Sequence, residues 1–243
     1  MRETTAIATT GIASPLLNQL MEELTAHPVN HHPFFVRFQA EYLTRRQLQA
    51  FFRQYHYFCK HFVKVLEGLL YVTPIDEVEM RVELIKTLHS ELGSGSCEQA
   101  HVKQLERFGQ KLGFDEFDLR RTEPIPEVKT YLQTLHRLFI KTDYLVALGA
   151  ELAVETTAAS EFRYFAPGLN KYPDFTPEDL IFFELHLQEE QHHSDWLLDG
   201  VRKTATTQEQ LARVTAGARQ IADGWHEFWN GMYREVFQER DPA

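Results

Sequence analysis

Apolar residues recur at helical spacing along most of the chain, and this periodicity constrains the fold more than any other feature. The clearest example follows Thr44, which opens a capping box with Gln47. Its apolar face carries large side chains: Phe51, Phe52, Tyr55, Phe58, Phe62, Leu66 and Leu69. No stretch shows convincing strand alternation or a hairpin dipeptide. The sequence therefore predicts an all-α bundle of seven or eight helices.

Caps and breakers divide the chain into the expected helices. Ser14 and Pro15 are typical of an N-cap and a first helical position. Helices are predicted over residues 15–26, 44–73, 76–91, 97–112, 127–162, 176–200 and 208–237. Residues 167–173 are predicted to form an irregular connection. Without a repeat, linker or composition shift, we expect residues 1–243 to form one domain, with 1–13 as a flexible N-terminal segment.

Composition excludes several classes of protein. A hydrophobic fraction of 43% argues against disorder, and a net charge of −10 argues against nucleic acid or an anionic membrane as the main partner. The two cysteines, Cys59 and Cys97, form no CxxC motif and fit a reducing compartment. There is neither a signal-peptide pattern nor a membrane-spanning apolar run. We expect a soluble cytoplasmic protein.

A run of possible metal ligands lies near the C-terminus. His186, Glu190 and His193 stand at i, i+4 and i+7, so on a helix they share one face. Two imidazoles and a carboxylate can bind a first-row metal if other helices supply further ligands. The competing interpretation is a solvated acidic and histidine-rich helix face.

Other helices offer candidate ligands on or near apolar faces. Glu91 precedes a glycine-containing break, and His101 follows that break on the next helix. Glu155 lies on an apolar stripe of the long helix, with Glu151 near it on the same side. Burying such a carboxylate is costly unless it is paired or binds a metal. Glu67 could also turn inward, although each of these residues taken alone is compatible with an ordinary surface or core position.

A second pattern competes with the first. Glu98 with His101, and Glu190 with His193, both form Glu-x-x-His. With Glu67 and Glu155 on other helices, they reproduce the two-Glu, two-Glu-x-x-His arrangement of di-iron carboxylate bundles. The two patterns differ over whether Glu91 or Glu98 is the acidic partner, and over whether His186 is a ligand.

The order of these residues resembles the haem-oxygenase-like di-metal oxidases and oxygenases, all-α proteins with the TenA/PqqC/CADD-like helical fold. This resemblance implies six metal ligands: Glu91, His101, Glu155, His186, Glu190 and His193. It leaves open as additional or alternative ligands Glu67, Glu98, Glu151 and Glu189. The family usually has Asp where this chain has Glu190. The candidates for residues that contact the ligands and so orient them are His89, His192 and Asp195. The candidates for pocket residues are Tyr55, Phe58 and Tyr144.

The resemblance implies an O2-activating non-haem di-iron enzyme, with two Fe(II) ions (Mn in place of Fe is an alternative) and O2 as co-substrate, acting on a small organic substrate. A homodimer and an external electron donor are left open. The alternatives are a metal-free TenA/PqqC-like hydrolase or cofactorless oxidase, and a non-catalytic CADD-like partner-binding protein. TenA-like thiaminases use a pocket cysteine, and neither cysteine here stands at an obviously matching position. In the CADD-like branch, which makes p-aminobenzoate from its own side chains, a lysine stands where this chain has Phe165.

Overall fold

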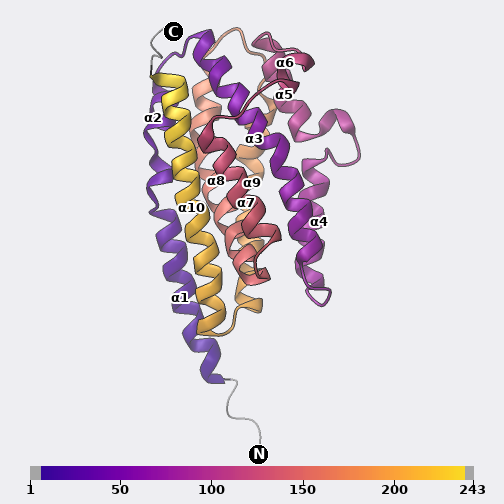
Figure 1. Ribbon diagram of the computed structural model, residues 1–243, viewed down its shortest axis with the longest axis vertical. Helices are drawn as coiled ribbons and strands as arrows, with labels where there is room; N and C mark the ends of the chain where they lie inside the picture. The colour runs from indigo at the N-terminus through magenta and orange to yellow at the C-terminus, as the bar shows by residue number, and fades with distance from the viewer. Residues whose placement is uncertain (1–6, 239–243) are drawn as a thin grey trace, which may run out of the picture.

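The computed structural model describes the backbone of residues 7–238. This part of the chain forms ten α-helices and two short 3-10 helices (Figure 1). Side chains are described for residues 15–187 and 196–238. The elements are α1 (Ile7–Thr25), η1 (Pro28–His31), α2 (Pro33–Ala40), α3 (Arg45–Val72), α4 (Val78–Glu91), η2 (Cys97–Gln99), α5 (His101–Lys111), α6 (Glu116–Arg120), α7 (Pro126–Ile140), α8 (Tyr144–Asn170), α9 (Ile181–Thr204) and α10 (Gln208–Phe237). Within this described part, no helix is long and apolar enough to cross a membrane.

The all-α prediction is confirmed, but seven or eight helices was too few. The expected helix over 127–162 is two helices, because Asp143 caps α8 by accepting a hydrogen bond from the Leu145 N–H at 2.9 Å. Two short helices were also missed. α2 is capped by the His32 side chain, which accepts from the Phe34 N–H, and α6 opens with a capping box at Asp115.

Several predicted helix ends also differ from the structure. α1 begins at Ile7 and contains Pro15, so the proline does not mark its start. α8 runs through Pro167 to Asn170, where an irregular connection was expected, and α9 begins only at Ile181. The capping box at Thr44 is present as predicted and opens α3.

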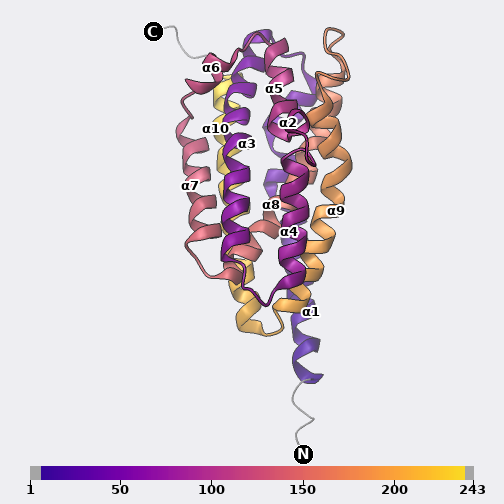
Figure 2. The same cartoon turned by 90° about the vertical axis from the view of Figure 1, so that its right-hand side faces the viewer.

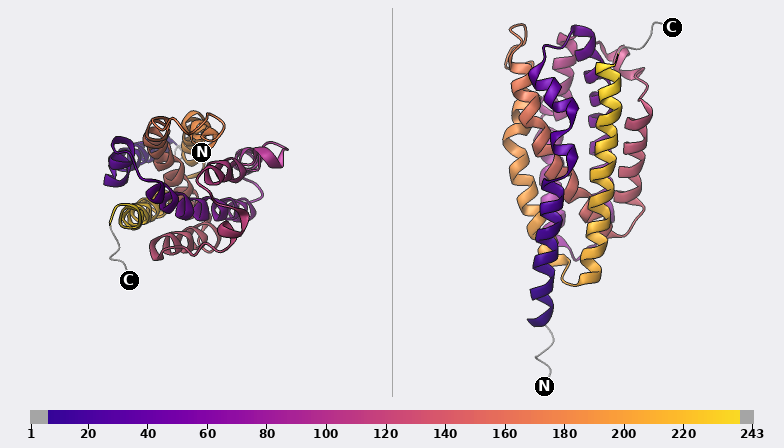
Figure 3. Two further views of the ribbon diagram at one scale, coloured as in Figure 1. Left: turned by 90° about the horizontal axis from the view of Figure 1, so that it is seen from above. Right: turned by 90° about the vertical axis from the view of Figure 1, so that its left-hand side faces the viewer.

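Helix α8 runs through the interior and packs against α2, α7, α9 and α10. It is apolar nearly all round, as expected of a helix buried on every side. It approaches α10 closely, because a Cβ at Gly149 would lie 1.9 Å from the Val214 carbonyl oxygen and one at Gly217 would lie 2.0 Å from that of Val146. α1 lies along α10, and its first turns reach beyond the end of the bundle (Figure 3).

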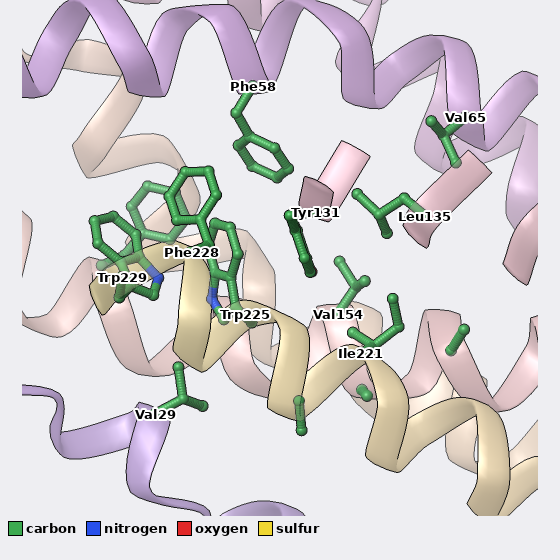
Figure 4. Packing of buried hydrophobic residues seen from close by; sticks show 14 of the residues in the cluster. Val29, Phe58, Val65, Tyr131, Leu135, Val154, Ile221, Trp225, Phe228 and Trp229 are labelled. Atoms are coloured by element: carbon green, nitrogen blue, oxygen red, sulfur yellow. The ribbon is translucent and has the colours of Figure 1, made fainter. Parts of the chain in front are cut away.

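Aromatic side chains fill the space between α3, α7 and α10. The Trp225 ring lies 4.9 Å from that of Phe58, 4.8 Å from that of Tyr131 and 4.3 Å from that of Phe228, measured between centroids (Figure 4). On the other side of α3 lies α4, which packs in turn against α9 (Figure 2). The candidate site lies where α4, α5, α8 and α9 meet.

Candidate metal centre

Three of the predicted ligands come together from three different helices. Glu91 ends α4, His101 begins α5 and His186 lies on α9. One ligand atom from each lies within 4.8 Å of the others. The Glu91 Oε1 atom is 3.1 Å from His101 Nδ1 and 3.9 Å from His186 Nε2. Both imidazoles are buried, so the cluster is enclosed rather than spread over a surface.

The glycine-containing break brings Glu91 and His101 together. Gly93 and Gly95 have φ angles of 84° and 94°, in the left-handed region that glycine enters without steric cost. A Cβ at Gly93 would lie 2.2 Å from the Ser96 carbonyl oxygen, so this tight turn requires glycine. The chain reverses there, and the first residue of α5 faces the last residue of α4.

His186 is held in one orientation by its own helix. Its Nδ1 lies 2.7 Å from the Phe182 carbonyl oxygen, and its ring stacks on Phe162 at 4.7 Å between centroids. A hydrogen bond to a carbonyl requires Nδ1 to carry the proton, which leaves the lone pair on Nε2, the atom nearer Glu91. This is the tautomer that binds a metal through Nε2, with the second nitrogen hydrogen-bonded behind it.

The cluster favours an ionised Glu91. Burial by itself would raise the pKa of this carboxyl, but the neighbouring imidazoles of His101 and His186 outweigh burial and lower its pKa well below the ordinary value. Glu91 is therefore a carboxylate at neutral pH, the protonation state that a metal ligand needs.

A second buried acidic pair lies on α8. Glu151 is 0% exposed and Glu155 is 5% exposed. Burial, followed by the neighbouring Glu155 carboxyl, raises the pKa of Glu151 well above the ordinary value. Apart from the Glu155 carboxyl, the Glu151 carboxyl has no hydrogen-bond partner among the described residues. Two adjacent buried carboxyls need a proton or a cation between them, and Glu155 lines the same cavity as Glu91, His101 and His186.

Five predicted residues lie outside the described side chains: Glu189, Glu190, His192, His193 and Asp195. The backbone of α9 is helical through this stretch. Their roles stay predictions.

The structure places four other candidates away from the cluster. Glu67 is partly exposed on α3 and pairs with Lys64, one turn before it, and Glu98 lies on the exposed 3-10 helix η2. His89 is exposed because it faces outward on α4. Tyr144, at the start of α8, does not line the cavity. The spacing of Glu98 and His101 is correct for a shared face, but Glu98 belongs to a different helix from His101.

A cavity of about 60 Å³ opens beside the cluster, large enough for several water molecules or part of a small ligand. Glu91, His101, Glu155 and His186 form one wall. The rest of the lining is mostly aromatic and includes Tyr55, Phe58, Phe62, Tyr131, Phe162, Phe182 and Trp225. Tyr55 and Phe58 therefore lie in the pocket wall where the sequence predicted them.

Two cavity residues were missed at the level of sequence, Cys59 and Glu161. Cys59 stands four residues after Tyr55 on α3, and extending that helical stripe would have found it. Glu161 stands three residues after Ala158 and seven after Val154 on α8, which also line the cavity, but it lies off the apolar stripe that carries Glu155, so that stripe gave no signal for it. Burial raises the pKa of the Cys59 thiol, so it is protonated at neutral pH.

Glu161 is buried against Tyr55, whose hydroxyl donates a hydrogen bond to its Oε1 at 2.6 Å. Burial raises the pKa of Glu161 to about 8, although the hydrogen bond from Tyr55 and the nearby Trp225 indole oppose that rise. This carboxyl is therefore mainly protonated at neutral pH, in contrast to Glu91.

The donor set suits iron or manganese. Imidazole nitrogens and carboxylate oxygens are ligands that both Fe(II) and Mn(II) accept. The buried, hydrogen-bond-deficient Glu151 carboxyl beside Glu155 gives a reason for a cation to lie between these groups. The fold and the cluster thus define a helical bundle built around a buried carboxylate–imidazole centre.

Comparison with known proteins identifies the family. The sequence model of the iron-containing redox enzymes, a haem-oxygenase-like family, matches residues 49–226. The chain belongs to this family and is an oxidoreductase.

Relatives with an assigned activity are 4-aminobenzoate synthases. That of Nitrosomonas europaea is 26% identical over 212 residues, which cover 83% of this chain and 84% of the relative. That of Chlamydia trachomatis is 26% identical over 164 residues, or 67% of this chain and 69% of the relative.

Solved structures confirm the haem-oxygenase-like fold. A CADD-like protein of unknown function from Nostoc punctiforme superimposes with a TM-score of 0.76 at 23% identity, covering 93% of this chain and 99% of that one. A TenA homologue from Pseudomonas syringae pv. tomato superimposes with a TM-score of 0.72 at 13% identity, covering 91% of this chain and 93% of that one.

Proposed function

We propose that this protein is an O2-activating non-haem oxidase or oxygenase with two metal ions, both iron or one iron and one manganese, that acts on a small organic substrate. The observation that carries the proposal is the meeting of Glu91, His101 and His186 on the wall of a mostly aromatic cavity. A substrate in this cavity would lie directly against the metal centre.

The ligand atoms would come from several helices. Glu91, His101 and His186 would hold metal from α4, α5 and α9, and Glu155 with Glu151 would contribute carboxylates from α8. Glu190 and His193 complete the set that the sequence predicts. Bound iron would supply the redox chemistry with O2. A carboxylate-rich set offsets the charge of two divalent ions, which the enclosed position requires.

The protein's own side chains would orient the centre and keep it dry. The hydrogen bond from His186 Nδ1 to the Phe182 carbonyl holds the imidazole while Nε2 faces the cluster. The aromatic wall limits the entry of water, and this protects reactive species from side reactions. Glu161, which also lines the cavity, holds a proton at neutral pH.

The 4-aminobenzoate synthases among the relatives suggest that activity for this chain as well. Phe165, at the place of the lysine in the CADD-like branch, is 0% exposed and packs against Phe38 at 5.1 Å and Trp229 at 5.7 Å between ring centroids. No amino group is available at this position. We therefore favour a substrate that enters from solution over one made from this side chain.

Iron binding tests the proposal. Anaerobic Fe(II) titration followed by elemental analysis should find close to two equivalents of metal in the wild type. His186→Ala should lose much of that metal, because it removes a buried imidazole from the cluster. His89→Ala is the matched control, since it removes an exposed histidine from a neighbouring helix and should bind metal like the wild type.

Exposure of the Fe(II)-loaded protein to O2 should give a transient visible absorption band and consume O2. A wild type that remains metal-free after loading would refute the proposal. Activity that persists in metal-free His186→Ala would instead support a metal-free hydrolase or cofactorless oxidase.

A further inference from the structure

Glu161 is a carboxyl of the cavity wall that pairs with a tyrosine hydroxyl, whereas Glu91 pairs with an imidazole. Glu161 is 2% exposed. Its Oε1 accepts a hydrogen bond from Tyr55, while its Oε2 is buried and has no hydrogen-bond partner in the described part of the chain. The Trp225 indole lies close enough to lower the pKa of the Glu161 carboxyl, but it does not donate a hydrogen bond to Oε2. A buried oxygen without a partner is costly and indicates that a ligand atom completes it.

The surroundings of Glu161 favour a cationic ligand group. Phe58, Tyr131 and Trp225 line the same cavity and present aromatic rings, which attract ammonium groups. No Lys or Arg occurs among the described lining residues, and residues 188–195 contain none either. An anionic ligand group at this end would face a carboxyl with no cationic side chain to balance it.

We propose that Glu161 is a substrate-binding residue and that the cavity takes a small primary amine, whose ammonium group displaces the Glu161 proton to solvent, donates a hydrogen bond to Glu161 Oε2 and faces the aromatic rings. This inference rests on the proposed function, because it names the substrate class of the same cavity. Tyr55 holds the carboxyl in place through Oε1, so that Oε2 remains for the ligand. The rest of the amine then extends toward the cluster of Glu91, His101 and His186.

Binding of three ligands of nearly equal size separates the alternatives. Benzylamine, benzyl alcohol and benzoate share one ring and differ only in the polar group. With the anaerobic Fe(II)-loaded full chain, isothermal titration calorimetry should show benzylamine binding at least about tenfold more tightly than benzyl alcohol, since a charge-assisted hydrogen bond exceeds a neutral one by that order. Benzoate should bind no more tightly than the alcohol.

Two variants assign the preference to Glu161. Glu161→Gln keeps the shape and removes the carboxyl that can ionise beside an ammonium group, so benzylamine should lose about tenfold or more in affinity while benzyl alcohol changes little. Glu98→Gln removes an exposed carboxyl and should leave both affinities unchanged. The comparison of ligands on the wild type stays decisive if Glu161→Gln fails to fold.

Equal affinity for amine and alcohol would overturn the proposal, as would tighter binding of benzoate. An equal loss of amine and alcohol in Glu161→Gln would show a merely structural role and would also overturn it. The same titrations on metal-free protein separate this inference from the proposed function. A wild type that binds no iron refutes the proposed metal centre. The proposed amine preference is tested separately, by comparing the affinities for benzylamine and benzyl alcohol in the metal-free protein.

Discussion

Replacing Glu161 with Gln should change how the free energy of unfolding depends on pH. The folded protein holds the Glu161 proton with a pKa of about 8, and the ordinary value is 4.5. Between these values the folded state binds more protons than the unfolded state, so wild-type stability falls as pH rises. This contribution is fully present below about pH 4.5 and is lost as pH rises through about 8. Gln does not titrate and carries no such dependence.

The size of the effect follows from the two pKa values. Each pH unit between them is worth about 1.4 kcal/mol, so the wild type should lose about 5 kcal/mol relative to Glu161→Gln across the window. All other ionisable groups are the same in both proteins, so their contributions cancel in the difference. The glutamine side chain introduced by Glu161→Gln can still accept the Tyr55 hydrogen bond through its carbonyl oxygen, which keeps the local packing comparable.

Urea denaturation of metal-free wild type and Glu161→Gln at pH 5, 6, 7 and 8 measures this difference. The stability of the variant relative to the wild type should rise steadily from pH 5 to pH 8. Glu98→Gln, which removes an exposed carboxyl, should follow the wild-type profile within about 0.5 kcal/mol. A difference that is flat with pH, or that falls, would refute the assignment of Glu161 as a buried protonated acid.

Two further predictions concern helix α8: its packing against α10 and the cap at its N-terminus. Gly149→Ala should destabilise the protein by about 1–3 kcal/mol or more in thermal or urea denaturation, because its Cβ would meet the backbone carbonyl of Val214. Gly200→Ala is the control, since its Cβ meets only a flexible methionine end; an equal loss there would contradict the packing argument. Asp143→Ala should cost about 1 kcal/mol in urea denaturation, because it removes the cap that accepts from the Leu145 N–H. An unchanged midpoint would show that the cap adds nothing.

Local sequence signals were sufficient for the fold class, and they predicted the kind of centre. Helical periodicity and capping boxes are local signals, and they predicted an all-α protein and the start of α3 at Thr44. The glycine-containing break between Glu91 and His101 also acts locally, because positive φ angles over a few residues set the reversal. The residue types then indicated a metal centre of imidazole and carboxylate ligands.

Which side chains meet depends on the tertiary structure. Glu98 is nearer to His101 in the sequence than Glu91 is, yet Glu91 faces the imidazole and Glu98 is exposed. Glu161 and Cys59 became cavity residues only because α3 and α8 place their faces together. Periodicity indicates that a face is buried, but the partner of that face is set by long-range packing. Whether a buried carboxyl finds a histidine, another carboxyl or a tyrosine, and hence its protonation state, depends on that partner.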